Sequence, residues 1–114
     1  MRHTMRLYPI PFNLIKQEAK TIELRLYDEK RKTISVGDEI EFINTENAEA
    51  SLICRVIALH RFSSFKELYN ALPLLKCGYT EEDIATASFS DMEAYYSREM
   101  QEKYGVIGIE LKLL

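Results

Sequence analysis

The sequence predicts an α+β fold, in the form of a small mixed or antiparallel β-barrel with helices at its ends. Strand-like segments follow one another through short turns, without the regular strand–helix alternation of a doubly wound parallel sheet. The longest segment, SLICRVIAL at residues 51–59, is apolar on both faces apart from Arg55, which is typical of a central strand in a curved sheet. A chain of 114 residues supports one modest core, so residues 1–114 are expected to form a single domain.

The first half of the chain supplies most of the expected strands and one helix. Alternating residues at 5–8 stop at Pro9, as a first strand does at a turn. Pro11 suits a first helical turn, and apolar residues at helical spacing extend that helix to about residue 18. Strict alternation then predicts a strand at 21–26. Another strand is predicted at 39–44, after a Gly-Asp turn, and precedes the central one.

The second half alternates helices with a closing strand. Ser64 followed by Glu67 has the spacing of a capping box, which predicts a helix from residue 65 onward. A short helical turn is expected from Thr80, and a second serine–glutamate pair predicts one helix over residues 90–105. The final stretch, VIGIELKLL, alternates again and predicts the last strand.

Composition excludes several classes of protein. Hydrophobic content of 46% and charged content of 29% are ordinary for a soluble globular domain. No apolar run approaches the roughly 18–20 residues of a membrane span, and the N-terminus lacks the apolar region of a signal peptide, so a cytoplasmic location is expected. Cys54 and Cys77 are expected to be reduced packing residues. His3 and His60 lack ligand spacing, and neither a metal nor a cofactor is predicted.

The net charge of −3 is unevenly distributed along the chain. Residues 1–36 carry a net charge of +4, and residues 37–114 carry −7. Because non-specific affinity for nucleic acid scales with the phosphates that are neutralised, a net acidic chain is a poor candidate for coating RNA. It can still contain one local basic site. The run from Lys30 to Lys32 is interpreted as a solvated turn.

The segment KTIELRL at residues 20–26 concentrates charge on one face of a predicted strand. Its apolar face is expected to lie in the core, and its other face carries Thr21, Glu23 and Arg25, with Lys20 just before it. From the pattern alone, the simpler interpretation is a solvated group of ion pairs, each worth under about 1 kcal/mol. The alternative is a cleft in which the charges recognise a polar ligand.

The chain resembles the activating signal cointegrator homology (ASCH) domain over nearly its whole length. The segments FNLIKQEAKTIELRLYDEKRKTISVGDEIEFIN, SFKEL and YYSREMQEKYGVIGIEL carry the resemblance, and the most specific part is Lys20-x-x-Glu23-x-Arg25 followed by Gly37-Asp38. The ASCH family belongs to a larger group of domains related to the pseudouridine synthase and archaeosine transglycosylase (PUA) fold. The resemblance implies a PUA-like β-barrel associated with RNA, with a cleft lined by Lys20, Glu23 and Arg25.

The resemblance also implies a possible enzyme activity. Some bacterial members are similar to amidohydrolases that deacylate N4-acetylcytidine with a lysine, a threonine nucleophile three residues later and a more distant glutamate. Here the lysine position is Lys20, but the threonine position is Glu23. A carboxylate cannot attack the amide as a hydroxyl does, although it could activate water, and Thr21 could serve as a displaced nucleophile. The family usually has a glycine about two residues before the lysine, and this chain has Glu18 and Ala19 there instead.

These observations favour a recognition module that binds RNA, a nucleotide or a modified nucleoside through Lys20, Thr21, Glu23 and Arg25. Glu23 is expected to accept hydrogen bonds from an exocyclic amine, and Arg25 to stack on a base or hold a phosphate. Tyr95 and Tyr96 are candidate base-stacking residues, although core packing is the simpler interpretation of one of them. Hydrolysis of an N4-acetylcytidine-like amide by Lys20 and Glu23 is the enzymatic alternative. A protein-interaction adaptor without a nucleic-acid ligand is the third.

Overall fold

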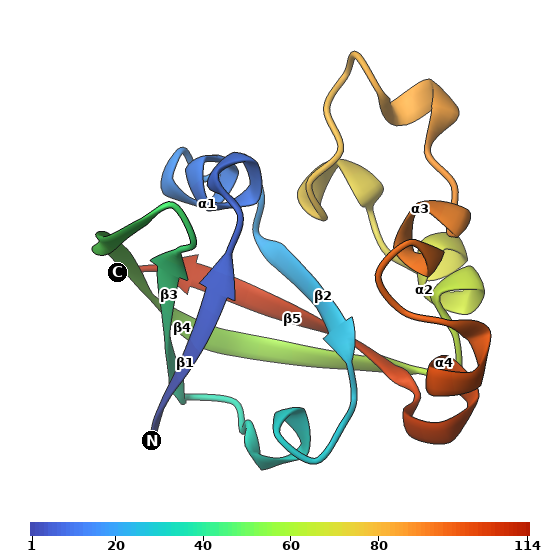
Figure 1. Ribbon diagram of the computed structural model, residues 1–114, viewed down its shortest axis with the longest axis horizontal. Helices are drawn as coiled ribbons and strands as arrows, with labels where there is room; N and C mark the ends of the chain where they lie inside the picture. The colour runs from blue at the N-terminus through green and yellow to red at the C-terminus, as the bar shows by residue number, and fades with distance from the viewer.

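One five-stranded mixed sheet forms the centre of the computed structural model, which describes residues 1–114 (Figure 1). The sheet has the strand order β1-β3-β4-β5-β2. Strands β1 and β3 are parallel, and the other neighbouring pairs are antiparallel. The strand bounds are β1 (Arg2–Leu7), β2 (Ile22–Leu26), β3 (Glu39–Asn44), β4 (Asn47–Phe62) and β5 (Val106–Leu113). The sheet curls into a half-barrel, so the predicted α+β, PUA-like barrel fold is confirmed.

The central strand is longer than the sequence predicted. β4 spans 16 residues and pairs with β3 along its first half and with β5 along its second half. Its register with β5 shifts between Val56 and Ala58. An irregularity of this kind increases the local twist of a strand, which allows one long strand to bend and serve both halves of a curled sheet.

Four helices cover the two ends of the sheet. Their bounds are α1 (Pro9–Lys16), α2 (Phe65–Ala71), α3 (Ser90–Glu93) and α4 (Arg98–Tyr104). Short 3₁₀ turns occupy Arg31–Thr33, Leu74–Lys76 and Ile84–Thr86, the last of them in the region where a helical turn was expected. Figure 1 shows α1 near β1 at one end, while α2, α3 and α4 gather on the far side of β2. None of these helices is long and apolar enough to cross a membrane.

The prediction of one helix over residues 90–105 was wrong, because the chain breaks into α3 and α4. Ser97 has extended backbone angles (φ −64°, ψ 161°), and its hydroxyl accepts a hydrogen bond from the N–H of Met100. A serine in this conformation caps a new helix instead of continuing an old one. The predicted cap at Ser64 is confirmed, since its hydroxyl accepts a hydrogen bond from the N–H of Glu67.

Strand β2 separates two apolar clusters. The larger cluster of 12 buried residues fills the half-barrel and includes Phe42 and Ile109. The smaller one includes Ile22, Leu24 and Leu26 together with Phe65 and Leu68 of α2. The apolar face of β2 is therefore core, as predicted, but its opposite face is also covered. This covering changes the environment of the charged side chains on that face.

The turn after α1 directs the chain into β2. Glu18 has a left-handed backbone (φ 61°), and its N–H donates to the carbonyl of Ile15 at 2.9 Å. The N–H of Ala19 donates to the carbonyl of Leu14 at 2.9 Å. These two bonds form a Schellman motif, which usually has glycine at the left-handed position. Lys20 follows directly, so the geometry of this turn sets where its side chain begins.

Candidate functional site

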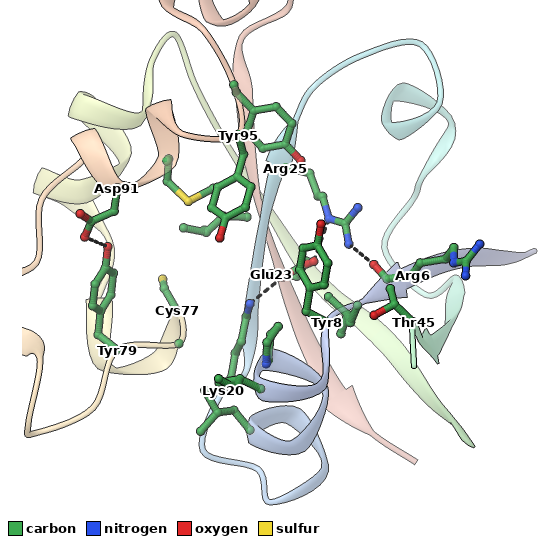
Figure 2. A pocket seen from close by; sticks show the side chains of 18 of the residues that line it. Arg6, Tyr8, Lys20, Glu23, Arg25, Thr45, Cys77, Tyr79, Asp91 and Tyr95 are labelled. Atoms are coloured by element: carbon green, nitrogen blue, oxygen red, sulfur yellow. Dashed lines mark hydrogen bonds and ion pairs between the residues drawn. The ribbon is translucent and has the colours of Figure 1, made fainter. Parts of the chain in front are cut away.

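A cleft of about 640 Å³ opens beside β2 and is lined by 19 residues. Strand β2 contributes Glu23, Leu24 and Arg25 to its floor, and the junction of β1 with α1 forms one wall (Figure 2). The opposite wall comes from α2 and from the long connection between residues 77 and 96. Small-molecule sites in proteins typically measure about 300–1,000 Å³, so the cleft is large enough for a ligand of that class.

Lys20, Glu23 and Arg25 form a buried ionic cluster at the base of the cleft. The Lys20 Nζ donates to Glu23 Oε1 at 2.7 Å, and the Arg25 Nε donates to Glu23 Oε2 at 2.7 Å. The side chains are 9%, 4% and 14% exposed in the same order. The charges are therefore sequestered and paired, which is incompatible with the interpretation of a solvated sheet face.

The electrostatics of the cluster keep Glu23 ionised. Burial by itself would raise the pKa of Glu23. The positive charges of Lys20 and Arg25, together with their hydrogen bonds, outweigh that effect and hold the pKa of Glu23 below its ordinary value. Burial would lower the pKa of Arg25, but Glu23 more than compensates and raises it. Glu23 and Arg25 are therefore both charged at neutral pH.

Arg25 also connects the two edge strands of the sheet. Its Nη2 donates to the backbone carbonyl of Arg6 on β1 at 2.9 Å. Strands β1 and β2 stand at opposite ends of the strand order and are not paired with each other. The guanidinium therefore spans the opening of the half-barrel, as Figure 2 shows.

The structure distributes the other predicted residues differently. Thr21 does not line the cleft, and its backbone instead bonds the carbonyl of Lys76 and the N–H of Leu111. Thr21 was expected to share the face of Glu23, but it precedes Ile22, the first residue of β2. Tyr95 and Tyr96 both line the cleft. Tyr95 is 64% exposed, whereas Tyr96 stacks on Phe65 with a centroid separation of 5.8 Å.

Several lining residues were not singled out from the sequence. Tyr8 lies at the start of α1 and Gly78 lies in the long connection. Gly78 has φ +113°, and a Cβ built there would stand 3.4 Å from the Cδ of Lys20, so the loop passes close to the lysine stem. The sequence signals were weak: an aromatic residue before Pro9, and an isolated glycine in a loop.

The far wall contains a chain of hydroxyl hydrogen bonds. The Tyr79 hydroxyl donates to Asp91 Oδ2 at 2.6 Å and lies 2.7 Å from the Tyr69 hydroxyl. Because Tyr79 gives its only proton to Asp91, Tyr69 must be the donor to Tyr79. These hydrogen bonds join the connection between residues 77 and 96 to α2, and so they support the wall that faces Lys20.

Neither a thiolate nor a metal cluster is part of this site. Cys77 lines the cleft, but burial raises the pKa of its thiol to about 11, so it is protonated at neutral pH. No group of three or more His, Cys, Asp or Glu side chains is arranged to hold a metal ion.

A curled mixed sheet with a cleft beside β2 defines an ASCH/PUA-like domain, and the comparisons with known proteins agree. The family model for the ASCH domain matches residues 5–114, and the chain belongs to this family. A search of curated proteins finds no match.

The solved structures that resemble the chain fall into two groups, one at 33–34% sequence identity and one at much lower identity. The hypothetical protein PH0355 is 33% identical with a TM-score of 0.82, and each chain is covered completely. Protein PF0455 from Pyrococcus furiosus is 34% identical with a TM-score of 0.76, covering 100% of this chain and 98% of its own. ASCH from Zymomonas mobilis is 12% identical with a TM-score of 0.69, covering 97% of this chain and 66% of its own, and supports the fold alone.

Proposed function

We propose that the cleft binds RNA, a nucleotide or a modified nucleoside, and that Lys20 and Arg25 make the polar contacts. The observation that carries the proposal is the burial of two cations around one carboxylate at the base of an open cleft. Burying charge is unfavourable unless it is paired, and a cluster of three leaves one positive charge in excess. An anionic or strongly polar ligand would complete the pairing.

The hydrogen-bond inventory specifies what the ligand should present. Lys20 has three N–H donors and uses one on Glu23, and Arg25 has no intramolecular partner for its Nη1. Both oxygens of Glu23 are already engaged, and this residue is 3% exposed. The cluster therefore offers donors, and we infer that the ligand contributes acceptors such as phosphate or base-carbonyl oxygens. Glu23 positions the two cations and is a poor partner for the exocyclic amine expected from the sequence.

Family membership supports a nucleic-acid ligand. The ASCH family is associated with RNA binding. The donor-rich floor and tyrosine-containing walls have the composition that RNA-binding sites use for phosphates and unstacked bases. The net charge of −3 favours a small local site over extended contact with an RNA backbone.

Hydrolysis of an N4-acetylcytidine-like amide receives less support. A general base works best when its pKa lies near the operating pH, and the pKa of Glu23 is lowered instead. Thr21, the alternative nucleophile, does not line the cleft. These two observations favour recognition over catalysis.

The proposal is tested by calorimetric titration of the four common ribonucleoside 5′-monophosphates into the wild type and Lys20→Gln. Hydrogen bonds to charged groups contribute about 1.5–3 kcal/mol, so the substitution should weaken binding by roughly 10- to 150-fold. Lys16→Gln is the matched control, because Lys16 is an exposed lysine of α1 that does not line the cleft. It should leave the dissociation constant unchanged.

Repeating the titration at two salt concentrations, with a short single-stranded RNA beside the mononucleotides, separates a polymer from a monomer ligand. Affinity for an RNA that neutralises several phosphates falls steeply with salt, whereas affinity for a mononucleotide changes little. The absence of binding to both probes would overturn the proposal and favour the protein-interaction alternative. Turnover of N4-acetylcytidine that disappears in Lys20→Gln would favour the hydrolase.

A further inference from the structure

Five of the seven tyrosines have a partner for their ring or hydroxyl within the protein, and two do not. The satisfied ones stack on an aromatic ring, bond another hydroxyl, or lie beneath a cation. They are Tyr27, Tyr69, Tyr79, Tyr96 and Tyr104. Tyr8 and Tyr95 make none of these contacts, and they are also the most exposed tyrosines, at 63% and 64%.

The two unpartnered tyrosines line the same cleft. Tyr8 comes from the junction of β1 and α1, and Tyr95 from the connection between α3 and α4, so they belong to opposite walls. Figure 2 shows both rings projecting into the cleft, in the region of Lys20 and Arg25. Isolated exposed aromatics are common on protein surfaces, but two at the mouth of one cleft indicate a surface built for contact.

Both side chains stand on constrained backbone. The carbonyl of Tyr8 accepts a hydrogen bond from the N–H of Phe12 at 3.0 Å, and the next residue is Pro9, whose ring fixes its φ angle. The N–H of Tyr95 donates to the carbonyl of Met92 at 3.0 Å. A tyrosine has only two side-chain torsions, so ordering these rings against a ligand costs little conformational entropy.

We propose that Tyr8 and Tyr95 form an aromatic clamp for the base of an unpaired nucleotide, with an acceptor-bearing edge of that nucleotide directed toward Lys20. This inference rests on the proposed function and specifies its ligand. A base in a duplex has both faces covered by neighbouring bases, whereas a single-stranded or free base offers its faces to aromatic side chains. The clamp therefore selects the planar ring, and the ionic cluster selects polar groups at its edge.

The test compares the tightest-binding of the four ribonucleoside 5′-monophosphates with ribose 5-phosphate, which retains the sugar and phosphate but has no base. The wild type should bind the nucleotide at least tenfold more tightly. Tyr8→Leu and Tyr95→Leu should each weaken nucleotide binding by about 5- to 150-fold, the range expected for loss of one base–aromatic stack, and should leave binding of ribose 5-phosphate unchanged. Tyr8→Phe and Tyr95→Phe should retain wild-type affinity, because they keep the ring.

The outcomes separate this inference from the proposed function. If both leucine variants bind the nucleotide as the wild type does while Lys20→Gln binds it weakly, the clamp is wrong and the polar site stands. If the wild type binds neither the four nucleotides nor the short single-stranded RNA, the proposed function fails, and the clamp fails with it. The thermal unfolding midpoints of the leucine variants should equal that of the wild type, because both side chains are exposed. Equal midpoints exclude loss of folding as the cause of weaker binding.

Discussion

Glu23 holds the two cations of the cleft in place, because each of its oxygens bonds one of them at 2.7 Å. Replacing Glu23 with alanine would leave Lys20 and Arg25 buried without a counter-charge. Breaking a buried ion pair in this way typically costs about 3–5 kcal/mol. We therefore expect Glu23→Ala to lower the free energy of unfolding in urea by that amount.

The control for this prediction is Glu41→Ala. Glu41 lies on β3 and forms no salt bridge, so its replacement should change the free energy of unfolding by less than about 0.5 kcal/mol. A loss below 1 kcal/mol for Glu23→Ala would mean that the cluster is solvated and contributes little.

The lowered pKa of Glu23 predicts how stability depends on pH. A carboxyl whose pKa is lower in the folded state stabilises the protein above its ordinary pKa of 4.5, and this contribution disappears as pH falls through the folded value. The free energy of unfolding of the wild type should therefore decrease below pH 4.5 more steeply than that of Glu23→Gln, which has no proton to gain at this position. Urea unfolding at a series of acidic pH values measures the difference. Parallel curves for the two proteins would show that the pKa of Glu23 is the same in the folded and unfolded states.

At the scale of elements, the turn that ends α1 contains a left-handed Glu18 at a position suited to glycine. A side chain in this conformation costs about 1–2 kcal/mol, although glycine recovers only part of that energy because it is more flexible when unfolded. Glu18→Gly should raise the thermal midpoint, and Glu18→Val should lower it, because a β-branched residue fits this conformation worst. The reverse order in a thermal melt would contradict the assigned turn.

The strands were predictable from the sequence because alternation reports directly on which side chains must be buried. The apolar faces of β2 and β5 are local patterns of this kind. Burial of the other face of β2 was not predictable, since it depends on α1 and on residues 77–96 folding over the strand from distant parts of the chain. The position of Tyr8 in the cleft wall was also missed, because it depends on tertiary structure. The break before α4 was missed because it depends on the extended backbone conformation of a single serine, Ser97.

At the scale of the whole molecule, the half-barrel has two unpaired edges that one side chain spans. The bond from Arg25 to the carbonyl of Arg6 joins β2 to β1, which no backbone ladder does. Arg25→Gln should therefore loosen this side of the sheet. We expect the amides of β1 and β2 to exchange with deuterium at least tenfold faster, because the substitution removes the hydrogen bond to Arg6, worth about 1.4 kcal/mol, together with the ion pair to Glu23.

Arg55→Gln provides the comparison, because Arg55 lies on the central strand and its ion pair with Glu39 is half exposed. It should leave exchange in β1 and β2 unchanged. Equal acceleration in both variants would show that Arg25 has no specific role in joining the edges, even if it contributes to the ionic cluster.

The most direct test of the central claim is a map of backbone amide chemical shifts during titration with the tightest-binding mononucleotide. If the ionic cluster is the binding site, the largest changes should fall on residues 20–25 of β2 and its approach, with smaller changes at Tyr8 and Gly78 on the two walls. Lys20→Gln should suppress these changes at the same nucleotide concentration. Shifts centred elsewhere, for example on the surface around Tyr27 and Arg61, would contradict the assignment of the cleft as the ligand site.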